Sequence, residues 1–154
     1  MAIVAAIGAS EASALGSAGA VTGPRQLLFF GTANIAAGDN ATPASSTPVQ
    51  SGFCGASAIG VGVPMIRPGY ITGLGIRLSG AAAGSEAIFG VYNGATLVAS
   101  LSIGLTGTQN YATYAEGLYT FAANDVLSVK IRTGSGWTAT TVDAAISVEI
   151  QTTT

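Results

Sequence analysis

Alternating apolar and polar side chains mark the second half of the chain. Between residues 126 and 150, two segments place every second residue in an apolar row and put polar or charged residues between them. These apolar rows are Leu127, Val129 and Ile131, and then Ile146, Val148 and Ile150. A period of two is typical of a strand with one buried face and one solvated face. Leu74, Ile76 and Leu78 repeat it, with Arg77 on the opposite face.

The sequence Asn93-Gly94-Ala95 separates two apolar segments, residues 87–92 and 96–101. Asn-Gly accepts the positive φ angles that a tight hairpin turn requires. The pattern therefore predicts an antiparallel hairpin at this point.

Residues 26–31, QLLFFG, form a continuous apolar run, which predicts a strand buried on both faces. A weaker, glycine-containing strand is predicted over residues 58–63, AIGVGV. With the segments above and a further strand predicted over residues 117–121, GLYTF, this gives about eight strands at intervals of roughly ten residues and no helix of useful length after residue 70. We therefore predict an all-β protein, an antiparallel β-sandwich of the jelly-roll type over residues 25–154. An immunoglobulin-like sandwich is the alternative.

Residues 1–24 are rich in Ala, Gly and Ser and predict an N-terminal arm or short helix. The segment is too short to fold alone and needs a surface to lie on. That surface is either a neighbouring subunit or the chain's own domain. Together with the apolar run that follows, it supplies the candidate partner-interface residues Ile3, Val4, Ile7, Leu15, Leu27, Leu28, Phe29 and Phe30.

Charged residues make up 8% of the chain, against roughly 25% in ordinary soluble proteins. The net charge is −2 and the five cations are scattered, which argues against nucleic acid or an anionic membrane as a partner. A soluble domain with a surface of small residues is one reading. The other is a protein whose surface is covered by copies of itself or by partners.

Residue types that carry chemistry are scarce. The chain has no histidine and one cysteine, Cys54, which excludes the usual general base and a normal zinc site. No Gly-x-Ser-x-Gly motif is present. Asp125 follows a turn-forming Ala-Asn pair and is expected to cap backbone N–H groups. We expect no enzyme, no cofactor and no metal; a hydrolase using Asp125 and Asp143 is the minor alternative.

Three aromatic residues are the candidates for stacking on a glycan: Tyr111, Tyr114 and Trp137. Each could equally belong to the core or to a protein interface. They support the alternative function of a receptor-binding domain.

Three motifs carry a resemblance to known proteins: RPGYITGLGIRLS at residues 67–79, FGVYNG at 89–94 and AANDVLSVK at 122–130. Together they resemble the β-sandwich modules of tailed-bacteriophage virion proteins, which include capsid cement (decoration) proteins and fibre or tail-associated domains. The resemblance extends over residues 67–151.

The resemblance implies a virion protein that forms homotrimers and sits on a capsid lattice or at a fibre tip, with an N-terminal arm reaching adjacent subunits. We expect a cement protein located on the capsid surface after assembly in the host cytoplasm. Its partners would be the major capsid protein and copies of itself. A fibre or tail domain that binds a host glycan is the second reading.

Overall fold

The computed structural model describes residues 22–35, 47–51 and 62–153. These residues form β-strands joined by turns and contain no helix. Accordingly, no helix within them is long and apolar enough to cross a membrane. The strands are β1 (Thr22–Thr32), β2 (Thr47–Ser51), β3 (Val63–Pro64), β4 (Gly69–Leu78), β5 (Ala87–Asn93), β6 (Thr96–Ile103), β7 (Gln109–Thr113), β8 (Thr120–Phe121), β9 (Val126–Thr133) and β10 (Ala144–Thr153).

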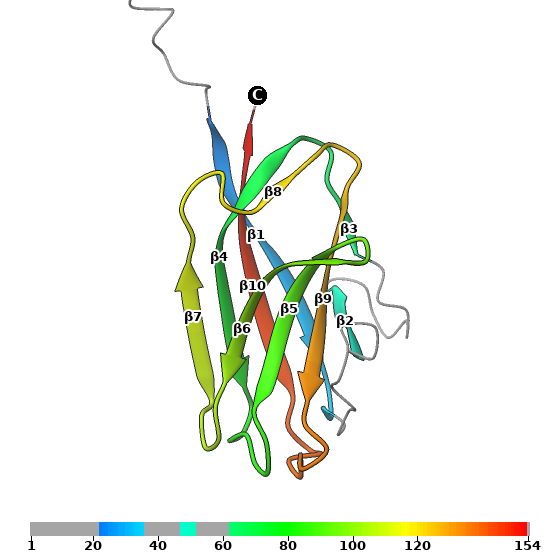
Figure 1. The fold of residues 1–154 in the computed structure, drawn as a ribbon, viewed down its shortest axis with the longest axis vertical. Coiled ribbons are helices and arrows are strands. Elements are labelled where there is room, and N and C mark those ends of the chain that lie inside the picture. The colour runs from blue at the N-terminus through cyan, green and yellow to red at the C-terminus, as the bar shows by residue number, and fades with distance from the viewer. Residues whose placement is uncertain (1–21, 36–46, 52–61, 154) are drawn as a thin grey trace, which may run out of the picture.

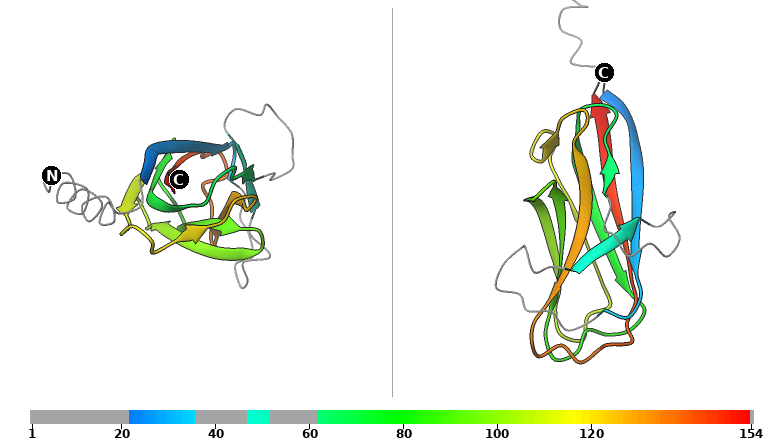
Figure 2. Two further views of the ribbon diagram at one scale, coloured as in Figure 1. Left: turned by 90° about the horizontal axis from the view of Figure 1, so that it is seen from above. Right: turned by 90° about the vertical axis from the view of Figure 1, so that its right-hand side faces the viewer.

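Eight of these strands build two facing four-stranded sheets (Figures 1 and 2). One sheet has the order β1-β10-β4-β7 and the other has the order β2-β9-β5-β6, with every pair antiparallel. The short strands β3 and β8 pair with β9 and β4. Apart from the β5–β6 hairpin, consecutive strands among these eight alternate between the two sheets, and this strand order is that of a jelly roll. The predicted all-β sandwich is confirmed, and the jelly roll is the arrangement adopted.

Strand β2 joins the two sheets along one edge. Its first residues pair with β9, and its last residues, Gln50 and Ser51, pair with Gly31 and Phe30 of β1. The first and last strands, β1 and β10, lie side by side, and the described chain begins and ends at the same end of the sandwich (Figure 1).

The core lies between the two sheets. Its largest fully buried side chains come from both layers: Ile71, Leu74, Phe89, Val91, Ile103, Leu127, Val129, Ile146 and Val148. All the apolar rows predicted from the period of two in β4, β9 and β10 point into this core. The alternation therefore identified the buried faces of these strands correctly.

The predicted hairpin joins β5 to β6, and its turn is one residue shorter than the predicted Asn93-Gly94-Ala95. Asn93 still pairs with Thr96, so the turn consists of Gly94 and Ala95. Gly94 has a φ of 59°, a conformation that costs glycine little. Asn93 is thereby released for a side-chain contact described below.

The prediction for the apolar run at residues 26–31 was wrong in one respect. The run does lie in β1, but Leu27 is 54% exposed and Phe29 is 45% exposed, while Phe30 is buried and Leu28 is partly buried. Among the described residues the sandwich has two layers, and the outward side chains of β1 lie on the face turned away from the other sheet. Strand β1 also begins at Thr22, within the segment predicted as an arm. The candidate residues Ile3, Val4, Ile7 and Leu15, and most of the strand predicted at 58–63, lie outside the described residues.

Candidate functional site

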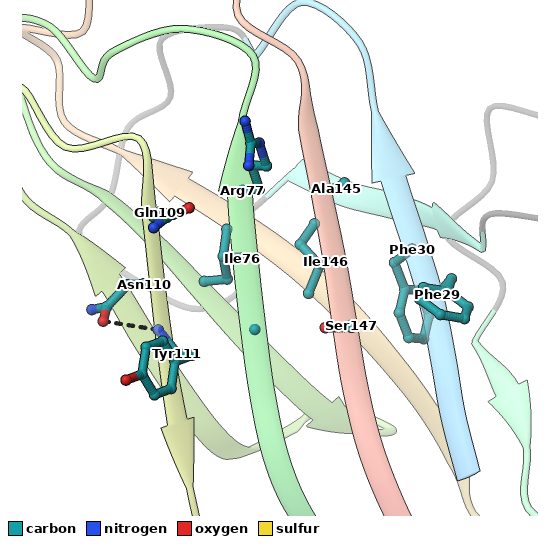
Figure 3. Close-up of a pocket in the computed structure, with 11 residues that line it drawn as sticks. Phe29, Phe30, Ile76, Arg77, Gln109, Asn110, Tyr111, Ala145, Ile146 and Ser147 are labelled. Carbon is teal, nitrogen blue, oxygen red and sulfur yellow. Dashed lines mark hydrogen bonds between the residues drawn. The ribbon is translucent and has the colours of Figure 1, made fainter.

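The outer face of the sheet β1-β10-β4-β7, the side turned away from the other sheet, carries the clearest surface feature. Its central row runs straight across the four strands, because Phe29 pairs with Ser147, Ser147 with Gly75, and Gly75 with Tyr111. Two aromatic side chains thus stand on the flanking strands, with two small residues between them (Figure 3). The end positions are three strand spacings apart, or about 14 Å.

This row forms the centre of a shallow groove with a volume of about 430 Å³. Gly75 keeps the groove open, since a Cβ atom at this position would lie 2.8 Å from Oγ of Ser147. Any larger residue at position 75 would fill the space between the aromatic walls. The groove is a consequence of small residues on β4 and β10 and of large ones on β1 and β7.

The rows on either side of the groove carry opposite charges. On one side, Arg77 is exposed, and the described residues offer it no ion pair. On the other side, Oε2 of Glu149 accepts a hydrogen bond from Oγ1 of Thr72 over 2.6 Å and lies 3.5 Å from Nη1 of Arg25. The side chain of Arg25 is 58% exposed, so this ion pair contributes little to stability.

Tyr111 is the most exposed aromatic residue of the outer face, at 80%. Its backbone N–H donates to Oδ1 of Asn110 over 2.9 Å (Figure 3). The amide of Asn110 in turn donates to the carbonyl of Ser102 on β6 over 2.7 Å. The strand that carries Tyr111 is therefore attached to the edge of the other sheet, which fixes its position.

The outer face of the other sheet differs, because its own side chains cover it. Tyr92 is 3% exposed and lies with Leu97 over Gly90, where a Cβ atom would be 2.8 Å from the Tyr92 ring and 2.7 Å from Leu97. The ammonium group of Lys130 lies 4.5 Å from the centre of the Tyr92 ring, a cation–π contact. Within the described part of the chain, no comparable contact covers the ring of Tyr111.

Two of the three aromatic residues proposed for glycan stacking are turned inward. Trp137 is 3% exposed, and its Nε1–H donates to the carbonyl of Ile35 over 2.9 Å inside the core. Tyr114 is partly buried against the core and makes an edge-to-face contact with Tyr119, with ring centroids 4.8 Å apart. Burial, and secondly the neighbouring Tyr119, raises the pKa of the Tyr114 hydroxyl. Trp137 is corrected to a core residue, and Tyr111 remains the accessible candidate.

The two carboxylates considered as catalytic groups of a hydrolase, Asp125 and Asp143, accept hydrogen bonds from turn and loop segments. Oδ2 of Asp125 accepts hydrogen bonds from the N–H of Ala122 over 2.7 Å and from the amide of Asn93 over 2.5 Å. The Ala122 hydrogen bond, and then that of Asn93, hold the pKa of Asp125 below its usual value of 3.8. Oδ1 of Asp143 accepts from the N–H of Asn34 over 2.9 Å. The predicted capping role of Asp125 is confirmed.

Within the described ranges, no group of three or more His, Cys, Asp or Glu side chains is placed to hold a metal ion. A second hollow, of about 520 Å³, opens at the edge of the sandwich between β1 and the segment around β3. Its lining is mainly apolar and includes Leu28, Met65 and Ile150. The outer face of β1-β10-β4-β7 therefore remains the candidate site.

No protein-family model matches the chain, and no curated protein does. Among solved structures, the chain is similar to one in the acid-stable capsid of Helicobacter pylori bacteriophage KHP30, with 11% identity, 84% of this chain and 89% of that chain covered, and a TM-score of 0.44. The capsid asymmetric unit of cyanophage Pam1 gives 11% identity, 86% coverage of both chains and a TM-score of 0.43. The tobacco streak virus coat protein dimer gives 16% identity, 83% and 85% coverage, and a TM-score of 0.35.

These neighbours are viral capsid and coat proteins. Their TM-scores all lie below 0.5, so the assignment of the jelly roll rests on the strand order of the chain itself.

Proposed function

We propose that the protein is a structural component of a virus particle, and specifically a cement protein that stabilises a capsid lattice built by a major capsid protein. The observation that carries this proposal is the outer face described above. It exposes Leu27, Phe29 and Tyr111 on one sheet, in a chain that has 8% charged residues. Large exposed apolar side chains gathered on one face favour a contact with another macromolecule.

The proposal includes the absence of catalysis. Asp125 and Asp143 accept hydrogen bonds from turn residues, and a carboxylate held in this way stabilises a loop. The fold fits the proposal but does not decide it, because jelly rolls occur in viral capsid proteins and also in lectins. The homotrimer and the capsid-surface location belong to the same proposal.

The test is to count copies in purified particles and to compare particles with and without the protein. We expect hundreds of copies per particle, and particles that lack the protein should open at lower temperature. Adding back wild-type protein should restore the opening temperature. A few tens of copies, or particles equally stable without the protein, would contradict the cement role.

A matched pair of variants connects the test to the outer face. Tyr111→Ala removes an exposed side chain from this face, whereas Leu105→Ala removes one that is 61% exposed in the β6–β7 loop. We expect Leu105→Ala protein to restore particle stability as well as wild type does, and Tyr111→Ala protein to restore it less. Equal rescue by both variants would exclude the outer face as the assembly contact.

One observation favours a second candidate, a fibre or tail-associated domain that binds a glycan. Tyr111 shares its groove with the polar side chains of Arg77 and Gln109, and sugar sites combine aromatic faces with a few placed polar groups. A glycan array would show binding that Tyr111→Ala abolishes and Leu105→Ala retains. Absence of binding by the wild-type protein would eliminate this candidate.

A further inference from the structure

We propose that the outer face is a contact between two copies of this chain. The two copies pack face to face about a two-fold axis that lies in the plane of the contact and runs across the strands through the row of Phe29, Ser147, Gly75 and Tyr111. This inference rests on the geometry of the face and does not depend on the virion role. Through this contact two isolated chains would form a dimer, and two larger assemblies would form a pair.

The symmetry decides which residues meet, since a contact of this type places one surface against itself. The central row faces its own copy, so Tyr111 lies against the partner's Tyr111. The two flanking rows exchange places. The row Leu27, Glu149, Gly73 and Thr113 faces the partner's row Gly31, Ala145, Arg77 and Gln109.

Side-chain size is complementary in the flanking rows, whereas the central row places Phe29 and Tyr111 against their own copies. On two of the four strands, a large residue in one flanking row faces a glycine or alanine in the other. Leu27 faces the partner's Gly31, and Glu149 faces the partner's Ala145. On β4, Arg77 faces the partner's Gly73, over which that copy's own Glu149 lies, because a Cβ atom at Gly73 would be 3.6 Å from Oε2 of Glu149. Large residues opposite small ones allow two sheets to approach to the usual separation of about 10 Å.

Charge is complementary as well. Arg77 is on β4 and Glu149 is on the adjacent strand β10, in opposite flanking rows. After the two-fold rotation, the partner's Glu149 lies one strand spacing, about 4.8 Å, from the point opposite Arg77. Both side chains are long enough to bridge this offset. The pairing occurs twice, and it supplies the ion pair that Arg77 does not find within the described part of its own chain.

The size of the face agrees with a reversible contact. The strands β1, β10, β4 and β7 have 11, 10, 10 and 5 residues. At the usual strand and residue spacings they give roughly 550 Å² per copy, or about 1,100 Å² in total. This is the lower limit for a specific interface. A contact of this size is weak between two single chains and is strengthened when several copies are held in one assembly.

Charge reversal with rescue tests the proposal on the isolated full-length chain. Dimerisation would be measured by sedimentation velocity from about 1 μM to 1 mM, a range that brackets weak interfaces. We expect the wild type to form dimers, and Arg77→Glu and Glu149→Arg each to weaken dimerisation at least tenfold. The double variant R77E/E149R should restore it to within about threefold of wild type. Arg67→Glu makes the same charge change off the outer face and should behave as wild type.

Cross-linking gives an independent measurement that does not alter Glu149, whose hydrogen bond to Thr72 matters to the fold. In a Cys54→Ser background, Tyr111→Cys should give a covalent dimer with a bismaleimide whose spacer is about 10 Å, the expected distance between the sheets. Leu105→Cys should not. A wild type that stays monomeric at 1 mM would overturn the proposal, as would a dimer that ignores both charge reversals or fails to cross-link at position 111.

Because no particle is needed, these outcomes are separate from those of the capsid experiments. A cement protein could fail to dimerise, and a dimer could have no place in a virion. If the outer face became buried only on assembled particles, and not between two copies in solution, it would be assigned to another partner. This outcome would also overturn the proposal.

Discussion

The side-chain amide of Asn93 donates a 2.5 Å hydrogen bond to Oδ2 of Asp125. Because Asp125 also accepts from Ala122, one carboxylate oxygen joins the end of β5 to the turn before β9. The register of the hairpin makes this contact available, since the turn itself uses Gly94 and Ala95.

Replacing either residue of this pair should lower stability, and replacing both should cost less than the sum of the two single changes. Asn93→Ala removes one hydrogen bond, whereas Asp125→Ala removes two, so the second variant should have the lower denaturation midpoint. Urea unfolding of the two single variants and the double variant measures the coupling. Strict additivity would show that the contact contributes nothing.

Protonation of Asp125 should make the free energy of unfolding depend on pH. The pKa of Asp125 is lower in the folded protein than its usual value of 3.8, so its contribution is fully present above that value and is lost as pH falls through the folded pKa. Asp125→Asn should therefore reduce the free energy of unfolding most at neutral pH, and the difference from wild type should shrink below about pH 4. A constant difference from pH 7 to pH 2.5 would contradict this linkage.

Trp137 should contribute to stability because the backbone carbonyl that accepts its hydrogen bond is buried. Trp137→Phe leaves the buried carbonyl of Ile35 without its partner, which should cost about 1–3 kcal/mol. Tyr111→Phe is the matched control, because it removes a polar group from a side chain that is 80% exposed, and it should be neutral. Thermal unfolding followed by circular dichroism compares them; equal melting temperatures would mean that Trp137 is not held as described.

Replacing Gly69 and Gly104 by alanine should change the stability of the protein in opposite directions. A Cβ atom at Gly69 would lie 2.8 Å from Cζ of Phe121 and 2.9 Å from Cα of Thr152, whereas one at Gly104 would have nothing within 4 Å. Gly69→Ala should therefore destabilise the protein by about 1–3 kcal/mol through overpacking. Gly104→Ala should be neutral or stabilise it by about 0.4–1 kcal/mol, because it restricts the unfolded chain. Chemical denaturation curves for both variants provide the measurement.

The sequence predicted the parts of the fold that follow from burial on one side only. Leu127, Val129 and Ile131 point into the core because every second residue of β9 faces the other sheet. The capping role of Asp125 also depends on a few adjacent residues, so it could be predicted without knowing the topology. The same local reasoning located the hairpin to within one residue.

The groove could not be predicted, because its central row comes from four strands that are distant in sequence. Phe29, Gly75, Tyr111 and Ser147 meet only through long-range pairing. Strand β7 was missed altogether, since Gln109 and Asn110 break the apolar alternation at the edge of a sheet. Leu27 and Phe29 were misread for the opposite reason: an apolar outer face looks, in sequence, like a second buried face.

The pairing of Thr22 with Thr153 has a mechanical consequence. Tension applied between these two ends would pull β1 and β10 apart from their shared end, and the hydrogen bonds between them would break one after another, as in a zipper. Tension directed along the strands from opposite ends of the sandwich would instead load the whole ladder at once. The domain should therefore yield at low force when pulled by its termini and resist much higher force when sheared lengthwise.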